Sequence, residues 1–100
     1  MKIFISQPMG DKTMDEILND RNQVIEKLKK TYPGAEFIDS FIIESAPESF
    51  TDPGVFYILK SLELLSNADL VVFLRGWDKY RGCRVEYEFA KNYGIDIKEE

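Results

Sequence analysis

Glu86 is the residue whose position in this sequence most favours chemistry. It lies near the start of a predicted helix that opens with Gly82, after a strand-like run at residues 70–74 and a polar loop at residues 75–80. The run is apolar and β-branched, which is typical of a buried parallel strand. Open α/β sheets bind ligands outside the carboxyl ends of their strands. Glu86 is therefore a candidate nucleophile or base, and the alternative is a glutamate that only complements the helix dipole.

The absence of histidine narrows the chemistry that this region can support. Because the chain has no His, acid–base chemistry is left to carboxylates, Tyr, Lys or the single cysteine, Cys83. Cys83 is expected to serve packing, since no partner base is present for a thiolate. Glu88 lies two residues beyond Glu86, about 200° around the helix, so the two carboxylates cannot face the same crevice.

Two loops supply further candidates. Ser6, Gln7 and Gly10 mark the turn after the first predicted strand, and a glycine there allows a ligand to approach the backbone closely. Neither the glycine pattern of a dinucleotide-binding loop nor that of a P-loop is present. Asp78 lies in the loop after the third predicted strand. It is a candidate acid, and the alternative is a solvated surface carboxylate.

Cations and aromatic rings surround the same predicted crevice. Arg75, Arg81 and Arg84 suit phosphate or carboxylate groups, and the alternative is pairing with neighbouring glutamates. Trp77 and Tyr80 suit stacking on a base or a sugar, and the alternative is an anchor at an interface.

These candidates depend on alternating strands and helices. Residues 13–16 form a capping-box sequence at a helix start, residues 32–34 end that helix, and Gly94 ends the last one. Strands are predicted at residues 3–6, 35–38, 70–74 and 95–97, and helices at about 13–31, 54–66 and 82–93. The long segment 39–53 between the second strand and the second helix is typical of a functional or mobile loop.

The predicted fold is α/β: a flavodoxin-like, three-layer α/β/α domain with a four-stranded parallel sheet in the order 2-1-3-4. Strands one and three are then neighbours at the switch point. The loops at 7–11 and 75–81 flank one crevice, and Glu86 stands over it. Asp69 opens strand three at the opposite end, so from position alone it is expected to cap a turn.

Length, composition and charge limit the number of domains, the partners and the location that can be expected. The 100 residues are expected to form one domain, 1–100, and the net charge of −5 argues against binding a nucleic acid polymer. One cysteine excludes an internal disulfide and a multi-cysteine metal site. With no apolar run of membrane-spanning length and no signal peptide, a cytoplasmic protein without membrane contact is expected. The small core, with Phe41, Ile42, Phe50 and Trp77 expected to be exposed, predicts a homo-oligomer that buries residues 39–53.

Three motifs carry a resemblance to a known family. They are the opening Lys2-Ile3-Phe4-Ile5-Ser6-Gln7-Pro8-Met9, then Asn67-Ala68-Asp69 before a Val-rich strand, and Gly82-x-x-x-Glu86-x-x-x-Ala90. In their order and spacing, the chain resembles the nucleoside 2-deoxyribosyltransferase-like superfamily. More closely, it resembles the short phage and bacterial domains of unknown function within that superfamily (DUF4406-like).

The resemblance implies N-glycosidic bond chemistry on a 2′-deoxynucleoside or nucleotide. In that family the glutamate matching Glu86 attacks C1′, the aspartate matching Asp69 assists, and a partner subunit often completes the site. No metal or other cofactor is expected. The enzymes of the family continue through another strand and helix that help build the base pocket, and Arg81 stands where its hydrolases have a phosphate-binding serine. The chain is therefore expected to keep the sugar–phosphate crevice, with the base site lost or moved. The candidate binding residues are Ser6, Gln7, Pro8, Met9, Gly10, Trp77, Arg81, Gly82 and Arg84.

Three hypotheses follow. The first is an enzyme that cleaves or transfers at the N-glycosidic bond, with Glu86 as nucleophile and Asp69 and Asp78 as further catalytic candidates. The second is a nucleotide-binding or sensor module without turnover. The third is a small oligomeric adaptor that binds a protein through its acidic surface or the loop with Trp77 and Tyr80.

Overall fold

A four-stranded parallel sheet organises the chain. The computed structural model describes residues 1–40, 42 and 44–100. The strands are β1 (Lys2–Ser6), β2 (Glu36–Phe37), β3 (Leu70–Phe73) and β4 (Asp96–Glu99), and they lie in the order β2-β1-β3-β4 with every pairing parallel. This confirms the predicted strand order and the flavodoxin-like α/β fold.

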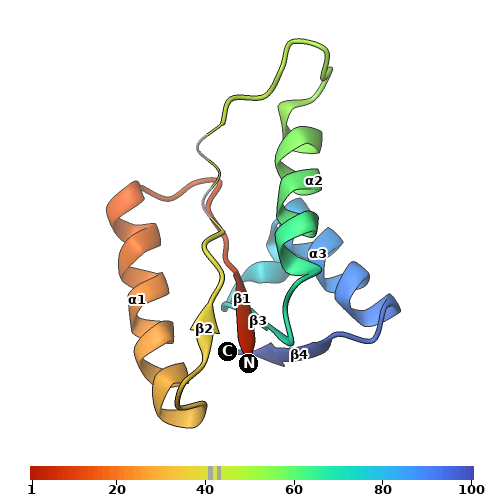
Figure 1. Ribbon diagram of the computed structural model, residues 1–100. Helices are drawn as coiled ribbons and strands as arrows, with labels where there is room; N and C mark the ends of the chain where they lie inside the picture. The colour runs from red at the N-terminus through yellow and green to blue at the C-terminus, as the bar shows by residue number, and fades with distance from the viewer. Residues whose placement is uncertain (41, 43) are drawn as a thin grey trace.

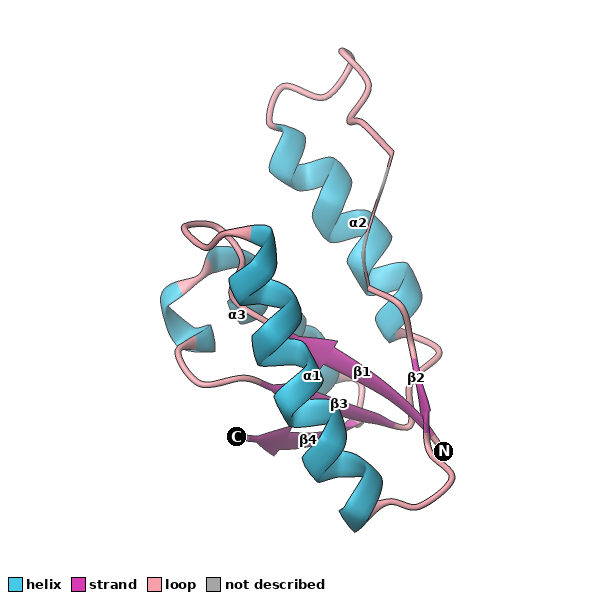
Figure 2. Cartoon of the chain, turned by 90° about the vertical axis from the view of Figure 1, so that its left-hand side faces the viewer, coloured by secondary structure: helices cyan, strands magenta, loops and turns pink. Residues whose placement is uncertain are grey.

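Helices cover both faces of the sheet (Figures 1 and 2). Alternate residues of β1 and β3 point to opposite faces. On one face, Ile3 and Ile5 pack with Val24 and Leu28 of α1 (Met14–Thr31). On the other face, the core is built from β1 and β3 with α2 (Pro53–Leu65) and α3 (Arg81–Asn92), through Phe4, Leu65, Val71, Phe73 and Ala90.

Local sequence signals fix where the helices begin. The predicted capping box is formed: Thr13 N donates to Glu16 Oε1 at 3.0 Å, and Glu16 N donates to Thr13 Oγ1 at 3.2 Å. Asp52 caps α2, since its Oδ1 accepts from Gly54 N at 2.8 Å. This places the start of α2 at Pro53, one residue before the predicted start.

The loop after β3 is more ordered than its polar sequence predicts. Gly76 has φ 88°, a conformation that favours glycine, and it leads into a short 3₁₀ helix, η1 (Trp77–Lys79). Trp77 lies over β3 and α3, because its ring stacks on Tyr87 with the ring centroids 4.4 Å apart. Its Nε1 donates to Glu99 Oε1 at 3.0 Å. Trp77 was predicted to be exposed, but these contacts leave it half-buried.

The edge strand β2 is short and leads into the long segment before α2. Arg21 of α1 is buried and donates to the Ile38 carbonyl at 2.9 Å and to Ser40 Oγ at 3.3 Å, which draws the chain toward α1. Farther along, Phe50 is half-buried against Phe56 in an edge-to-face contact, with the ring centroids 5.6 Å apart. Ile42 is also half-buried, and Phe41 lies outside the described residues.

Helix α2 is apolar on nearly all sides yet little covered. Its only charged residues are Lys60 and Glu63, and Leu65 is its one buried residue. Val55, Tyr57 and Leu59 are exposed. The start of α2 and the loop before it extend beyond the sheet (Figure 1). No helix in the described part of the chain has the length and apolar character needed to cross a membrane.

Candidate active site

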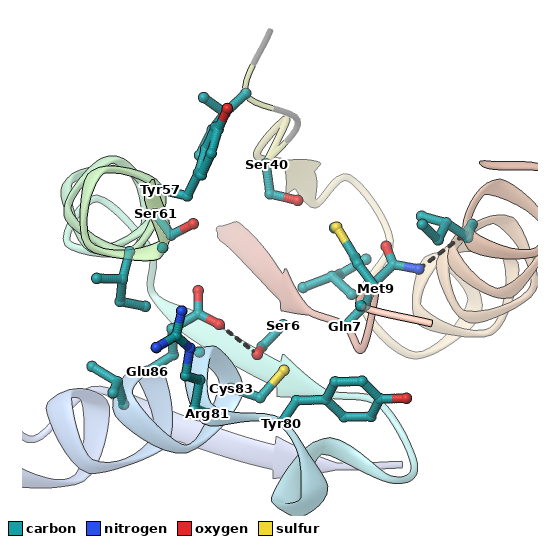
Figure 3. Close-up of a pocket in the computed structure, with 18 of the residues that line it drawn as sticks. Ser6, Gln7, Met9, Ser40, Tyr57, Ser61, Tyr80, Arg81, Cys83 and Glu86 are labelled. Carbon is teal, nitrogen blue, oxygen red and sulfur yellow. Dashed lines mark hydrogen bonds between the residues drawn. The ribbon is translucent and has the colours of Figure 1, made fainter. Parts of the chain in front are cut away.

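A pocket of about 680 Å³ opens beyond the carboxyl ends of β1 and β2 (Figure 3). Its lining comes from the end of β1, the loop that follows, Ser40 and Ile42, and the first turns of α1, α2 and α3. A volume of this size falls within the usual range of small-ligand sites, about 300–1,000 Å³. Most of the lining is apolar, so the few polar groups in it determine what the pocket can bind.

Glu86 and Ser6 form the polar centre of this pocket. Ser6 is the last residue of β1, and its Oγ donates to Glu86 Oε1 at 2.8 Å. Glu86 projects from α3 and is only 7% exposed. Burial raises the pKa of Glu86 to about 7, although the hydrogen bond from Ser6 opposes this rise. The carboxyl group therefore changes charge near neutral pH, as catalytic carboxylates often do.

Cys83 lies one turn before Glu86 in the same lining. Burial raises the pKa of its thiol to about 11, with a smaller contribution from the nearby Glu86 carboxylate, although a hydrogen bond with Ser6 opposes this rise. At neutral pH the sulfur is therefore protonated and a poor nucleophile. Glu86 therefore stays the candidate nucleophile of the described lining.

Gln7 contributes a second buried polar group. It is 6% exposed, and its Nε2 donates to the Ile17 carbonyl of α1 at 2.8 Å. Its Oε1 is buried and has no hydrogen-bond partner among the described residues.

An ion pair joins the starts of α2 and α3 at the rim of the pocket. Arg81 Nη1 and Nη2 donate to the two carboxylate oxygens of Asp52 at 2.8 and 3.1 Å. The pair lowers the pKa of Asp52 and raises that of Arg81. A Cβ at Gly54 would lie 2.3 Å from Arg81 Nη2, so a glycine there leaves room for this contact.

The structure brings most of the predicted binding residues together. Those that line the pocket are Ser6, Gln7, Met9, Gly10, Arg81, Gly82 and Glu86. Pro8 is buried between Gln7 and Met9 but is not part of the lining.

Besides Pro8, four predicted site residues lie outside the pocket lining. Asp69 lies at the opposite end of the sheet, where its Oδ2 accepts from Lys2 N at 2.7 Å. Asp78 is exposed in η1, and its carbonyl oxygen accepts from Arg84 Nη1 at 3.0 Å, which holds that arginine outside the pocket. Trp77 is held by the stacking on Tyr87 described above.

Sequence reasoning missed the contribution of the second crossover to this site. Ser40, Tyr57 and Ser61 all line the pocket. Tyr57 and Ser61 are four residues apart on a helix that is otherwise largely apolar, so they share one face. This pair of hydroxyls was the feature of the sequence that could have indicated that α2 lines the pocket.

One family model matches nearly the whole chain. The model of a family described as "Domain of unknown function (DUF4406)" matches residues 1–99. No curated protein and no solved structure matches the chain. Within the described residues, no group of three or more His, Cys, Asp or Glu is placed to hold a metal ion.

Proposed function

The chain belongs to the DUF4406 family, and we propose that it cleaves or transfers at the N-glycosidic bond of a 2′-deoxynucleoside or its 5′-monophosphate, with Glu86 as nucleophile. The observation that carries this proposal is a buried Glu86 carboxyl group, held by Ser6, inside a pocket of ligand size. The resemblance of the three sequence motifs to nucleoside 2-deoxyribosyltransferases supports the choice of substrate.

The proposed reaction has two steps. A Glu86 oxygen attacks C1′, the bond from C1′ to the base nitrogen breaks, and the base leaves with the bonding electrons and takes up a proton. The sugar is then held as an ester on Glu86. Attack of water on C1′ then breaks the ester bond to Glu86 and completes a hydrolysis, and attack of a second base breaks the same bond and completes a transfer. In either case the attacking group loses a proton to solvent, and Glu86 is released as a carboxylate. Each step passes through an oxocarbenium-like transition state, as in retaining glycosidases.

The environment of Glu86 fits this role in two respects. The Ser6 hydroxyl orients the carboxylate and stabilises its charged form. The lining is largely apolar, so a bound ligand would displace water from around Glu86 and strengthen electrostatic interactions within the pocket.

Incubation of the protein with a panel of deoxynucleosides and their 5′-monophosphates, with free base measured by chromatography, tests the proposal. The nucleophile must be ionised, so kcat/KM is expected to rise as the pH increases through about 7, the pKa of Glu86. A rate that falls through this range would mean that Glu86 acts as an acid. No base release from any member of the panel would remove the enzymatic proposal.

A second candidate function, nucleotide binding without turnover, is favoured by one observation. Glycosidases commonly use two carboxyl groups, but Glu86 is the only carboxylic residue in the described pocket lining. Asp69 and Asp78 lie elsewhere. Saturable binding of a nucleotide without base release would support this alternative.

We also propose that two or more copies of the chain associate through α2. A helix that is apolar on most sides is normally buried, and Leu59 is 54% exposed. The protein is expected to elute as a dimer or larger assembly in size-exclusion chromatography with light scattering. Leu59→Glu is expected to shift it to monomer.

Leu18 offers a matched control for that variant. It is also an exposed leucine, 40% accessible, but it lies on α1 and outside the pocket lining. Leu18→Glu is expected to leave the assembly intact. A wild-type protein that is monomeric at high micromolar concentration would contradict the association.

A further inference from the structure

Strand β4 leaves one edge of the sheet open. In the order β2-β1-β3-β4 its single neighbour among the described residues is β3, and no helix lies beyond its other edge in either view (Figures 1 and 2). An open edge presents backbone N–H and C=O groups that can pair with another strand. The opposite edge of the sheet is β2, which has only two residues, so β4 is the edge that is long enough to pair.

The hydrogen bonds of the sheet decide which backbone groups of β4 face this open edge. Glu100 N donates to the Phe73 carbonyl of β3 at 2.9 Å. In a parallel ladder, alternate residues of one strand bond to the same neighbour. Asp96 and Lys98 therefore also turn their backbone groups toward β3. Those of Ile97, which lies between them, point to the open edge.

The side chains of β4 carry complementary charges on one face. Asp96 and Lys98 lie on the face that α1 covers, because their register partners on β3 belong to the core on that face. Within the described residues, neither side chain is in an ion pair. Lys98 Nζ makes one weak contact, 5.8 Å from the centroid of the Tyr32 ring. An acidic and a basic residue placed in this way can pair with the same two residues of an antiparallel second copy.

Charge selects one register for such a pairing. The direction of the Ile97 backbone groups allows two-fold antiparallel pairings that are centred on Asp96, on Ile97 or on Lys98. A centre at Asp96 or Lys98 places that residue opposite its own copy, and like charges directly opposite destabilise a sheet. A centre at Ile97 places each Asp96 opposite the Lys98 of the second copy. These are non-hydrogen-bonded positions, where facing side chains lie closest.

We infer that two copies of the chain pair through β4, antiparallel about Ile97, and form one sheet with four strands from each copy. Two ion pairs between Asp96 and Lys98 and the contact of two half-buried Ile97 side chains stabilise this interface. Because β4 has only four residues, the association is expected to be weak, with a Kd of about 0.1 mM. The strand β3 separates β4 from β1, so the pocket beyond β1 and β2 stays open in both copies. The inference rests neither on the proposed reaction nor on the association through α2.

Charge exchange across the interface tests this inference. Sedimentation equilibrium is measured up to about 1 mM in a Leu59→Glu background, which removes the association through α2 and is monomeric at the low micromolar concentrations of size-exclusion chromatography. This background protein is expected to dimerise at high concentration. Asp96→Lys and Lys98→Asp, each added alone, are expected to weaken the dimer at least about tenfold, because each sets like charges opposite one another. An equimolar mixture of the two variants is expected to restore dimerisation, because every facing pair then has opposite charges.

Asp15→Lys and Lys27→Asp are matched controls. They make the same changes of charge at exposed positions of α1. Alone or mixed, they are expected to leave the Kd of the dimer within about twofold of the background value. A background protein that stays monomeric at about 1 mM, or a mixture of the β4 variants that associates no better than either variant alone, would overturn the inference.

Amide hydrogen exchange followed by NMR tests the pairing without any substitution in β4. In the same background, exchange of the Ile97 amide is expected to slow about threefold between about 20 µM and 1 mM, because its N–H is bonded only in the dimer. The amides of Asp96 and Lys98 are bonded to β3 in both states and are expected to change less. An Ile97 amide whose exchange does not depend on concentration, or equal slowing of all three amides, would contradict the assigned strand pairing.

Discussion

Glu86→Gln is expected to slow base release at least about a hundredfold, while Glu88→Gln is expected to change the rate by less than about threefold. Glutamine keeps the size of Glu86 and an oxygen that can accept the hydrogen bond from Ser6 Oγ. It removes the negative charge that forms the ester and stabilises the oxocarbenium-like transition state. The measurement is the initial rate of base release at saturating and at low substrate concentration.

Glu88 is a suitable control because it has the same chemistry in a different environment. It lies on the same helix but is exposed and outside the pocket lining. Both variants remove one negative charge from α3, so a general effect of charge would appear in both. Equal losses in the two variants would contradict the assignment of Glu86 as the nucleophile.

The Glu86→Gln substitution is also expected to stabilise the fold, most strongly above neutral pH. Burial raises the pKa of Glu86 from 4.5 to about 7, so between these values the folded protein binds this proton more tightly than the unfolded chain does. The contribution of protonated Glu86 to the free energy of unfolding is therefore fully present below pH 4.5, and it is lost as the pH rises through about 7. At about pH 8, the ionised Glu86 is expected to cost roughly 3 kcal/mol.

Urea denaturation of Glu86→Gln and wild type at two pH values measures this effect. The variant is expected to be more stable by roughly 3 kcal/mol near pH 8, and by less than about 0.5 kcal/mol near pH 4.5. Glu88→Gln, at an exposed site, is expected to show no such dependence. A difference in stability that is the same at both pH values would contradict a buried, neutral-pH titration of Glu86.

The pattern of apolar residues was sufficient to predict the architecture. The buried runs at β1 and β3 alternate with helical segments, and the right-handedness of crossovers between parallel strands leaves few sheet orders open. The position of Glu86 followed from the phase of α3, because a carboxylate four residues before buried Ala90 shares its face. The carboxyl edge of the sheet was therefore predictable as the place where this residue lies.

Contacts between distant segments were not predictable in the same way. The pair of Arg81 with Asp52 joins residues separated by 29 positions, and no local pattern in the sequence indicates it. Trp77 was expected at the crevice, but η1 and the stacking on Tyr87 place it outside the pocket lining. The orientation of Gln7 likewise depends on where the first turn of α1 places the Ile17 carbonyl.

Mass spectrometry of the protein quenched in acid during incubation with a deoxynucleoside tests the central claim most directly. The account predicts that the peptide containing Glu86 gains the mass of one deoxyribosyl group, and that the gain is absent in Glu86→Gln and present in Glu88→Gln. Release of base with the sugar attached to another residue, or with the same rate in the Glu86→Gln protein, would contradict the account.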